Sequence, residues 1–158
     1  MIATIDRQRG LAKQGIQPWH IPEDDEHFET QTKSLGGMVL IGDTTFKLLG
    51  SKPFPERHTY VLSRDRSLTM DSVELVPDLE KFLDHWQGQD VWIVGGANVF
   101  SQVLELHKAD ELYLTQIKAD FGCTQFFPEY EEQFTLVDQS DLREQNGFIF
   151  TFARYTRK

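Results

Sequence analysis

Short apolar runs and more polar stretches alternate along nearly the whole chain. The apolar runs hold four to eight residues and are rich in β-branched side chains, a pattern typical of buried strands. They are IATI at 2–5, MVLIG at 38–42, TYVLS at 59–63, SVELV at 72–76, VWIVGG at 91–96, ELYLTQI at 111–117, TLVDQ at 135–139 and FIFTFARY at 148–155. The pattern therefore predicts eight strands.

Four of the stretches between these strands have the length and residue spacing of helices. They cover residues 22–33, 44–49, 78–87 and 97–106. Helices between successive strands favour right-handed crossovers and a mostly parallel sheet that is covered on both faces. The last two strands have no helix between them, so we expect an antiparallel hairpin at the sheet edge. The predicted class is α/β, with an eight-stranded, mostly parallel mixed sheet and about four flanking helices.

The length and charge of the chain narrow its class. A chain of 158 residues suits one compact domain over residues 1–158, because folding at this size removes roughly 70% of the unfolded surface from water. Sixteen basic residues against 25 acidic ones give a net charge of −9, which disfavours binding to nucleic acid or to an anionic membrane. Any anionic ligand must therefore be bound by local basic groups and backbone amides.

The sequence has no N-terminal hydrophobic signal, no run of about 20 apolar residues, and a single cysteine, Cys123. These features predict a soluble cytoplasmic protein without an intrachain disulfide. Cys123 is either a structural thiol or a reactive one, and the lack of a neighbouring histidine favours the structural role. The five histidines show no metal-ligand spacing, so no metal site is predicted.

A long polar segment, DRQRGLAKQGIQPWH at 6–20, joins the first strand to the first helix. A connection of this length inside a small domain is more often functional than incidental. The alternative is a disordered surface loop. We therefore treat residues 6–20 as a candidate functional loop.

Three strands end in residues that suit a phosphate group. In VWIVGGANVF, Gly95 and Gly96 lie between a strand and a helix that starts at about Ala97, where backbone amides can bind an anion. A plain tight turn is the alternative, since the dinucleotide fingerprint G-x-G-x-x-G is absent. Ser63 and Arg64 follow a second strand and combine a hydroxyl with a fixed cation.

The third of these strand ends is GDTTF at 42–46. Asp43 is expected to cap the helix that follows, which leaves Thr44 and Thr45 near the positive end of that helix. Ordinary capping explains this motif equally well when it is taken alone. Three such ends in one sheet nevertheless favour a dinucleotide over a single small anion.

Four acids in a row, EDDE at 23–26, follow Pro22 in PWHIPEDDEHF. Acids in the first turn of a helix are favoured by its dipole by up to about 1 kcal/mol each, so helix initiation alone explains them. Residues four apart share a helix face, however, and Asp24, Phe28 and Thr32 form one row. An inward-facing row carries Asp24 towards the core or a cleft, where burial raises the pKa of its carboxyl. Asp24 is therefore the candidate functional acid.

Taken together, these motifs resemble the dihydrofolate reductase family over nearly the whole chain. The resemblance rests on IATIDRQRGLAKQGIQPWHIPEDDEHF, MVLIGDTTF, PFPERHTYVLSRD, VWIVGGANVF, ELYLTQI and FFPEY. The PWxxPxD element, with Phe four residues after the Asp, is specific when it precedes G-x-x-T-[FW] and V-G-G-x-x-[VI]-[FY]. The family fold, an eight-stranded mixed sheet with four helices, agrees with the predicted elements.

The resemblance implies roles for residues around a bound pterin. The implied catalytic residues are Asp24, which would bind the pterin amide and 2-amino group, its hydroxyl partner Thr115, and Trp19, which would hold an ordered water. Arg57 would bind the α-carboxylate of the glutamate tail through its bidentate fork. The implied substrate-binding set is Ile2, Asp24, Phe28, Lys52, Arg57, Val94 and Thr115, with Ile2 and Val94 contributing backbone carbonyls.

The resemblance also implies an NADPH site. Thr4 and Leu11 would lie at the nicotinamide, residues 10–16 would form a mobile lid, and Ser63 with Arg64 would bind the adenosine 2′-phosphate. The implied set is Thr4, Gly10, Leu11, Ala12, Lys13, Gln14, Gly15, Ile16, Thr44, Thr45, Ser63, Arg64, Gly95, Gly96, Ala97, Asn98, Val99 and Phe100. The family pattern is not kept at Asp43 or at Cys123, Thr124 and Gln125, and this last run is where the lid would be steadied.

The implied reaction is hydride transfer from NADPH to C6 of 7,8-dihydrofolate with protonation at N5, which yields 5,6,7,8-tetrahydrofolate for one-carbon metabolism. Catalysis would come from close positioning of the two reacting carbons and from exclusion of water. The expected partner is the small-molecule substrate, bound by a monomer. Two alternatives stay open: the pyrimidine reductase of riboflavin synthesis, which shares the fold but lacks PWxxPxD, and a non-catalytic folate- or nucleotide-binding protein.

Overall fold

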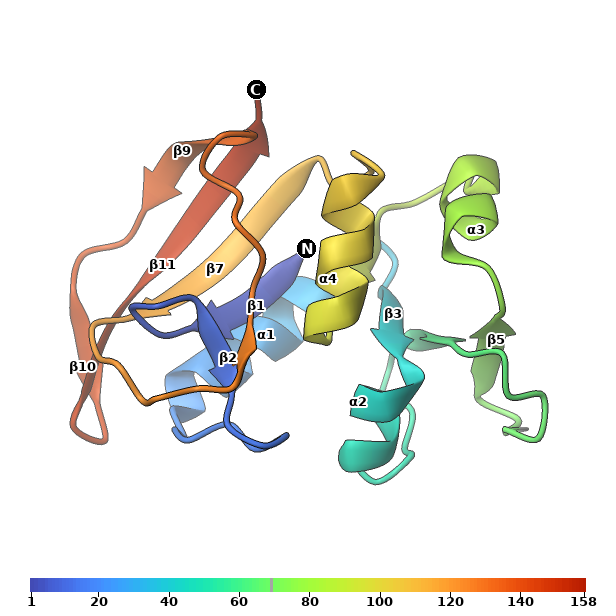
Figure 1. Cartoon of the computed structure of the whole chain (residues 1–158), viewed down its shortest axis with the longest axis horizontal. Coiled ribbons are helices and arrows are strands. Elements are labelled where there is room, and N and C mark those ends of the chain that lie inside the picture. The colour runs from blue at the N-terminus through green and yellow to red at the C-terminus, as the bar shows by residue number, and fades with distance from the viewer. Residues whose placement is uncertain (69) are drawn as a thin grey trace.

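The computed structural model describes residues 1–68 and 70–158 and contains all eight predicted strands (Figure 1). Seven of them are buried or half-buried on at least one face, which explains why they appear as apolar runs in the sequence, whereas the strand at 134–139 is buried only at Phe134. They are β1 (Ile2–Ile5), β3 (Met38–Gly42), β4 (His58–Leu62), β5 (Val73–Val76), β6 (Val91–Ile93), β7 (Glu111–Ile117), β9 (Phe134–Gln139) and β11 (Phe148–Arg157).

Three further strands were not predicted. They hold only two or three residues each, namely β2 (Gly10–Ala12), β8 (Gln125–Phe126) and β10 (Arg143–Gln145). Strands of two or three residues have no measurable hydrophobic period, so only their pairing partners define them. The pairing of β2 with β8 places the candidate loop 6–20 beside the segment around Thr124.

The four predicted helices are present. They are α1 (Pro22–Lys33), α2 (Asp43–Leu48), α3 (Leu79–His85) and α4 (Ala97–Glu105). Helix α4 buries an apolar stripe of Val99, Phe100, Val103 and Leu104, whereas α1 turns a polar row inward and buries Asp24 and Thr32. A buried carboxyl group and a buried hydroxyl both need hydrogen-bond partners inside the protein.

The strands form a mixed sheet system that agrees with the predicted class. The order β5-β4-β3-β6 is parallel throughout, and β1 pairs with β7 in parallel. Strand β11 then runs antiparallel to β7 and also pairs antiparallel with β9 and with β10, which confirms the C-terminal hairpin. Contacts among Ile2, Val39 and Trp92 join β1 to the β3–β6 side.

Helices cover both faces of this layer (Figure 1). Helix α4 lies in front of the strands and α1 lies behind them, while α2 and α3 lie on the side of β3 and β5. Among the described residues, no helix is long and apolar enough to cross a bilayer. The α1 face and the carboxyl ends of β3 and β4 are the two regions that hold the polar residues singled out in the sequence.

Candidate functional site

The Asp24 carboxylate is held between two strands by two hydroxyl groups. Thr115 Oγ1 donates to Asp24 Oδ1 and Thr4 Oγ1 donates to Asp24 Oδ2, each at 2.5 Å. Thr4 and Thr115 are direct partners in the β1–β7 ladder, so both hydroxyls emerge on the same face of the sheet. Thr115 is the partner that the sequence predicted, whereas Thr4 was assigned only to the nicotinamide and its contact with Asp24 was missed.

The other acids of the 23–26 run face away from this site. Asp24 is 8% exposed, whereas Asp25 and Glu26 are exposed and Glu23 is half-buried. Burial raises the pKa of Asp24, and the hydrogen bonds from Thr115 and Thr4 and the nearby His27 oppose that rise. The helix-face argument that selected Asp24 is therefore confirmed.

The C-terminal hairpin anchors the start of α1. The Glu23 backbone N–H donates to Gln145 Oε1 at 2.7 Å, and the Glu23 carboxylate pairs with Arg143. Asn146 Nδ2 donates to the His20 carbonyl at 3.1 Å. These contacts fix the first turn of α1 from a segment 120 residues further along the chain, and no local sequence signal indicates them.

An apolar wall lies beside Asp24. Phe28, Phe54 and Val94 pack against a buried cluster that contains Ile2, and the rings of Phe28 and Phe54 are 5.9 Å apart between centroids. The structure thus brings Ile2, Phe28 and Val94 together as predicted. Phe54 was missed, although an aromatic residue between two prolines in PFPER is a usable signal for a rigid apolar contact.

Trp19 lies in a second apolar cluster with Ile21, Ile117, Cys123 and Phe150. Its indole N–H is buried and has no hydrogen-bond partner within the described residues, so it can donate to an ordered water. Burial also raises the pKa of the Cys123 thiol to about 11. A thiol that is protonated at neutral pH agrees with the structural role predicted for Cys123.

Arg57 is held in one orientation by neutral groups. Its Nη1 donates to Thr32 Oγ1 at 2.8 Å, its Nε donates to the Pro55 carbonyl at 2.9 Å, and its guanidinium lies 5.0 Å above the Phe54 ring. Thr32 in turn donates to the Phe28 carbonyl at 2.7 Å. Because no carboxylate takes up the guanidinium in these contacts, its positive charge is available to an anionic ligand.

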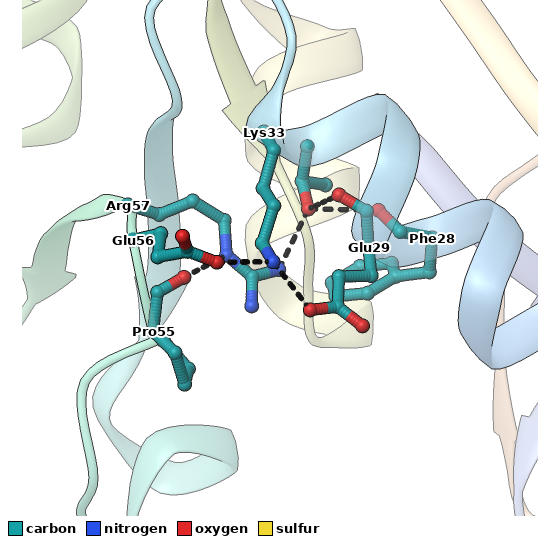
Figure 2. Close-up of polar contacts among 7 residues, drawn as sticks. Phe28, Glu29, Lys33, Pro55, Glu56 and Arg57 are labelled. Atoms are coloured by element: carbon teal, nitrogen blue, oxygen red, sulfur yellow. Dashed lines mark hydrogen bonds and ion pairs between the residues drawn. The ribbon is translucent and has the colours of Figure 1, made fainter.

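Lys33 forms ion pairs with the two acids on either side of Arg57. Figure 2 shows Lys33 between Glu29 of α1 and Glu56, and the Lys33 Nζ lies 2.5 Å from Glu29 Oε1 and 2.6 Å from Glu56 Oε2. Two carboxylates are thus paired with one ammonium beside the guanidinium. Lys52, which was predicted at this rim, is exposed and takes part in none of the hydrogen bonds or ion pairs of the described residues.

A cleft of about 970 Å³ lies at the carboxyl ends of β3 and β4 and at the start of α4. The residues predicted for a diphosphate and a 2′-phosphate that line it are Thr44, Thr45, Ser63, Arg64, Gly96, Ala97, Asn98 and Val99. Phe100 does not line the cleft, because its ring packs in the main core 4.9 Å from Phe127. Gly95 does not line the cleft either, and its carbonyl accepts a hydrogen bond from the Gly42 N–H at 2.8 Å.

The start of α4 suits the phosphate groups of a dinucleotide. Helix α4 has Gly96 at its N-cap, no side-chain cap and no acid in its first turn, so its first N–H groups are free to donate. A Cβ on Gly96 would lie 2.6 Å from Thr45 Oγ1, so only glycine fits between the start of α4 and α2. The residues present therefore fit the predicted cofactor at this end.

The prediction that Asp43 caps α2 is wrong. Helix α2 begins at Asp43 itself, Gly42 occupies the N-cap position, and no side chain caps the helix. Asp43 Oδ2 instead accepts a hydrogen bond of 2.8 Å from Ser63 Oγ, because β3 and β4 pair with Gly42 beside Leu62. The helix starts one residue earlier than predicted, which moves the carboxylate from the cap to the strand end.

The candidate lid is a tight hairpin. Lys13 and Ile16 exchange backbone hydrogen bonds of 2.8 and 3.1 Å around Gln14 and Gly15. These central residues have φ of 50° and 80°, as a two-residue hairpin turn requires. Ile16 at this tip is 71% exposed, whereas Leu11 packs against the main core.

The altered run at 123–125 holds this hairpin directly. Thr124 Oγ1 accepts from the Gln14 N–H at 2.8 Å, and Gln125 Oε1 accepts from the Gly15 N–H at 2.9 Å. The Thr124 N–H donates to the Ala12 carbonyl at 2.9 Å. The lid is therefore steadied by Thr124 and Gln125 although the family pattern is not kept there.

Comparisons with known proteins agree with this arrangement. The family model for dihydrofolate reductase matches residues 1–157. A dihydrofolate reductase from Staphylococcus aureus is 32% identical to this chain, and the alignment covers 100% of this chain and 97% of the relative. A dihydrofolate reductase from Aedes albopictus is 28% identical, and the alignment covers 99% of this chain and 96% of the relative. A solved dihydrofolate reductase from Enterococcus faecalis, complexed with NADP(H) and RAB-propyl, has a TM-score of 0.85 and 26% identity, and covers 99% of this chain and 94% of that one.

Proposed function

This chain belongs to the dihydrofolate reductase family and reduces 7,8-dihydrofolate to tetrahydrofolate with NADPH, and we propose that Asp24 binds the pterin in that reaction. The observation that carries this proposal is the pair of hydroxyl groups, from Thr4 and Thr115, that hold both oxygens of a buried carboxylate. An ionised carboxylate accepts about four hydrogen bonds, so two acceptor sites remain for the pterin amide and 2-amino group.

The rest of the site supports this orientation. Phe28, Phe54, Val94 and Ile2 offer an apolar surface to the pterin and aminobenzoyl rings, and Arg57 offers a preoriented cation to the glutamate tail. The Ile2 and Val94 carbonyls remain our proposed acceptors for the pterin amines. Lys52 is assigned to the rim of the tail site by resemblance alone.

The bound cofactor supplies the hydride that is added to C6. The open start of α4 and the hydroxyls of Thr44 and Thr45 would bind its diphosphate, and the hairpin at 10–16 would close over its nicotinamide and exclude water. Thr4 of β1 and Leu11, which packs against the main core, are our proposed nicotinamide contacts. Ser63 and Arg64 are the proposed contacts at the adenosine end.

Protonation at N5 is assigned to water. Asp24 binds the opposite edge of the pterin, where its negative charge stabilises the cationic ring and raises the basicity of N5. The buried indole N–H of Trp19 has no partner among the described residues, which supports its role as the donor to that water. Both ends of the site come from one chain, which supports a monomer, and a free Cys123 thiol is compatible with the reducing cytoplasm.

The test is turnover by the purified chain. NADPH oxidation, followed as loss of absorbance, should occur only after dihydrofolate is added. Saturable binding of both ligands without turnover would instead support the non-catalytic binding protein. Turnover of a riboflavin-pathway pyrimidine with none of dihydrofolate would support the pyrimidine reductase.

A further inference from the structure

At the adenosine end of the cofactor cleft, the carboxylate of Asp43 lies where the strands β3 and β4 end. Asp43 and Ser63 directly follow the paired residues Gly42 and Leu62, so their side chains meet at the ends of β3 and β4. Ser63 Oγ donates to Asp43 Oδ2 at 2.8 Å and accepts from the Asp65 N–H at 3.0 Å. The hydroxyl proton of Ser63 is therefore already bound to an acid.

The charge of the cleft lining is also negative. The charged residues among the described residues that line the cleft are Asp43, Asp78, Glu80, Glu105 and Arg64. Four carboxylates against one guanidinium leave an excess of three negative charges. Lys47 lies nearby, but its ammonium is 4.0 Å from Asp65 Oδ2. The phosphate groups of a cofactor must therefore be bound by backbone amides and hydroxyls, with a single arginine to offset the acids.

The two nicotinamide cofactors differ in the group that would lie at this end. In dinucleotide sites generally, an acid that accepts from the ribose 2′-hydroxyl accompanies NADH, and an arginine accompanies the 2′-phosphate of NADPH. A phosphate monoester carries nearly two negative charges at neutral pH, so Asp43 repels it, whereas a 2′-hydroxyl can donate to Asp43. Arg64 is exposed and acts in the opposite direction on the phosphate.

We propose that Asp43 sets the cofactor specificity of this enzyme and that NADH serves as a second hydride donor, with a kcat/KM within about tenfold of that for NADPH. This inference rests on the proposed function of the cleft. Dihydrofolate gains a hydride at C6 from the cofactor and a proton at N5 from water, and NAD⁺ is released, so the step balances as it does with NADPH. Asp43 distinguishes the two cofactors through its interaction with the group on the 2′ position of the adenosine ribose.

Binding of adenosine fragments tests the proposal without turnover. Calorimetry should give wild-type dissociation constants for 2′,5′-ADP and for 5′-AMP that agree within about tenfold. Asp43→Arg should tighten 2′,5′-ADP by at least tenfold and change 5′-AMP by less than threefold. Asp43→Ser, which removes the charge with a smaller side chain, should give the same direction if Asp43→Arg fails to fold. Glu132→Arg is the matched control, because it makes the same charge change on an exposed residue outside the cleft lining.

Turnover with the two cofactors completes the test. The NADPH-to-NADH ratio of kcat/KM should be below about ten in the wild type and should rise at least tenfold in Asp43→Arg, with Glu132→Arg unchanged. A wild-type ratio above 100, or equal responses of Asp43→Arg and Glu132→Arg, overturns the proposal. Loss of turnover with both cofactors would count against the proposed function, while the fragment affinities would still decide the role of Asp43.

Discussion

The two ends of the site differ in whether the acids near their arginine are paired with a second cation. At the tail end, Arg57 is held by the Thr32 hydroxyl and the Pro55 carbonyl, and the flanking acids Glu29 and Glu56 are both bound by Lys33. At the adenosine end, Asp43 accepts from the neutral hydroxyls of Ser63 and Thr44, and Arg64 lines a cleft that also contains four carboxylates. A cation can bind an anionic ligand strongly only where the neighbouring acids are already paired.

The presence of an arginine alone therefore does not make a strong anion-binding site. Both ends contain one, and both contain acids within the same small region. Only the tail end pairs those acids with a second cation. We infer that carboxylate recognition is strong at Arg57 and that phosphate recognition at Arg64 is weak. The Asp43 variants test the adenosine end, and the Arg57 and Lys33 variants below test the tail end.

The largest effect is expected from Asp24, which lies between the two ends. Asp24→Asn should lower the hydride-transfer rate at neutral pH by about 10²–10³, because the neutral amide cannot stabilise the cationic pterin. The rate should partly recover in acid, where the pterin is already protonated. Stopped-flow measurement of NADPH oxidation against pH checks this.

The matched control is Asp25→Asn, since Asp25 is the exposed neighbour of Asp24 on the same helix. Its rate should stay within about twofold of the wild type, because an exposed charge contributes little. Equal losses in the two variants would contradict the assignment of a single functional face to α1.

The next effect concerns the tail end alone. Arg57→Leu should raise the KM for dihydrofolate by about 100-fold with little change in kcat, because a preoriented charged hydrogen bond to a carboxylate is lost. The control substrate is 7,8-dihydropteroate, which lacks the glutamate. A comparable rise in KM for dihydropteroate would show that Arg57 supports the pocket rather than the tail.

A smaller effect is expected at Lys33, and it tests the pairing of acids directly. Lys33→Met should raise the KM for dihydrofolate by about three- to tenfold, because two uncompensated carboxylates then lie beside Arg57. Steady-state kinetics should show no change with dihydropteroate. Lys108→Met, which breaks a surface ion pair with Asp84, is the control and should leave both KM values unchanged.

Removing the flanking acids should reverse the Lys33 effect. The triple variant Lys33→Met, Glu29→Gln, Glu56→Gln should return the KM to within about twofold of the wild type, because the guanidinium regains its uncompensated charge. Failure of this rescue would mean that Lys33 acts by holding α1 to the Glu56 segment and not by neutralising charge.

The smallest effect is a change in stability. Burial raises the pKa of Asp24, so the folded state holds the proton more tightly than the unfolded state. That group contributes no penalty below its unfolded pKa, and it destabilises the ligand-free protein as pH rises through its folded pKa. Asp24→Asn should therefore raise Tm at neutral pH by about 2–4 °C, a gain that shrinks as pH falls. Calorimetric scans from neutral pH into acid check this, and a pH-independent gain would contradict it.

The sequence predicted the features that depend on local periodicity. The eight strands were visible as apolar runs, and the row of Asp24, Phe28 and Thr32 followed from helical spacing. The β2, β8 and β10 strands were missed because a run of two or three residues is too short to show a hydrophobic period. The cap role of Asp43 was wrong because helix boundaries shift by a residue or two with tertiary contacts.

The contacts between distant segments could not be predicted in this way. The Thr4 hydroxyl reaches Asp24 only through the β1–β7 register, and Lys33 reaches Glu56 only because α1 packs beside the segment before β4. Of the two ion pairs of Lys33, only the one with Glu29 can be expected from the sequence, since the two residues are four apart on one helix. Family resemblance supplied the roles of Trp19 and Arg57, for which spacing gave no argument.

The anchoring of α1 by the C-terminal hairpin constrains the order in which the enzyme matures. Arg143, Gln145 and Asn146 are synthesised at least 120 residues after the segment around Asp24 that they fix. Thr115 likewise appears long after Asp24. A nascent chain therefore cannot hold Asp24 in place before residues 143–146 have been made, and competence to bind folate is gained long after α1 itself is synthesised.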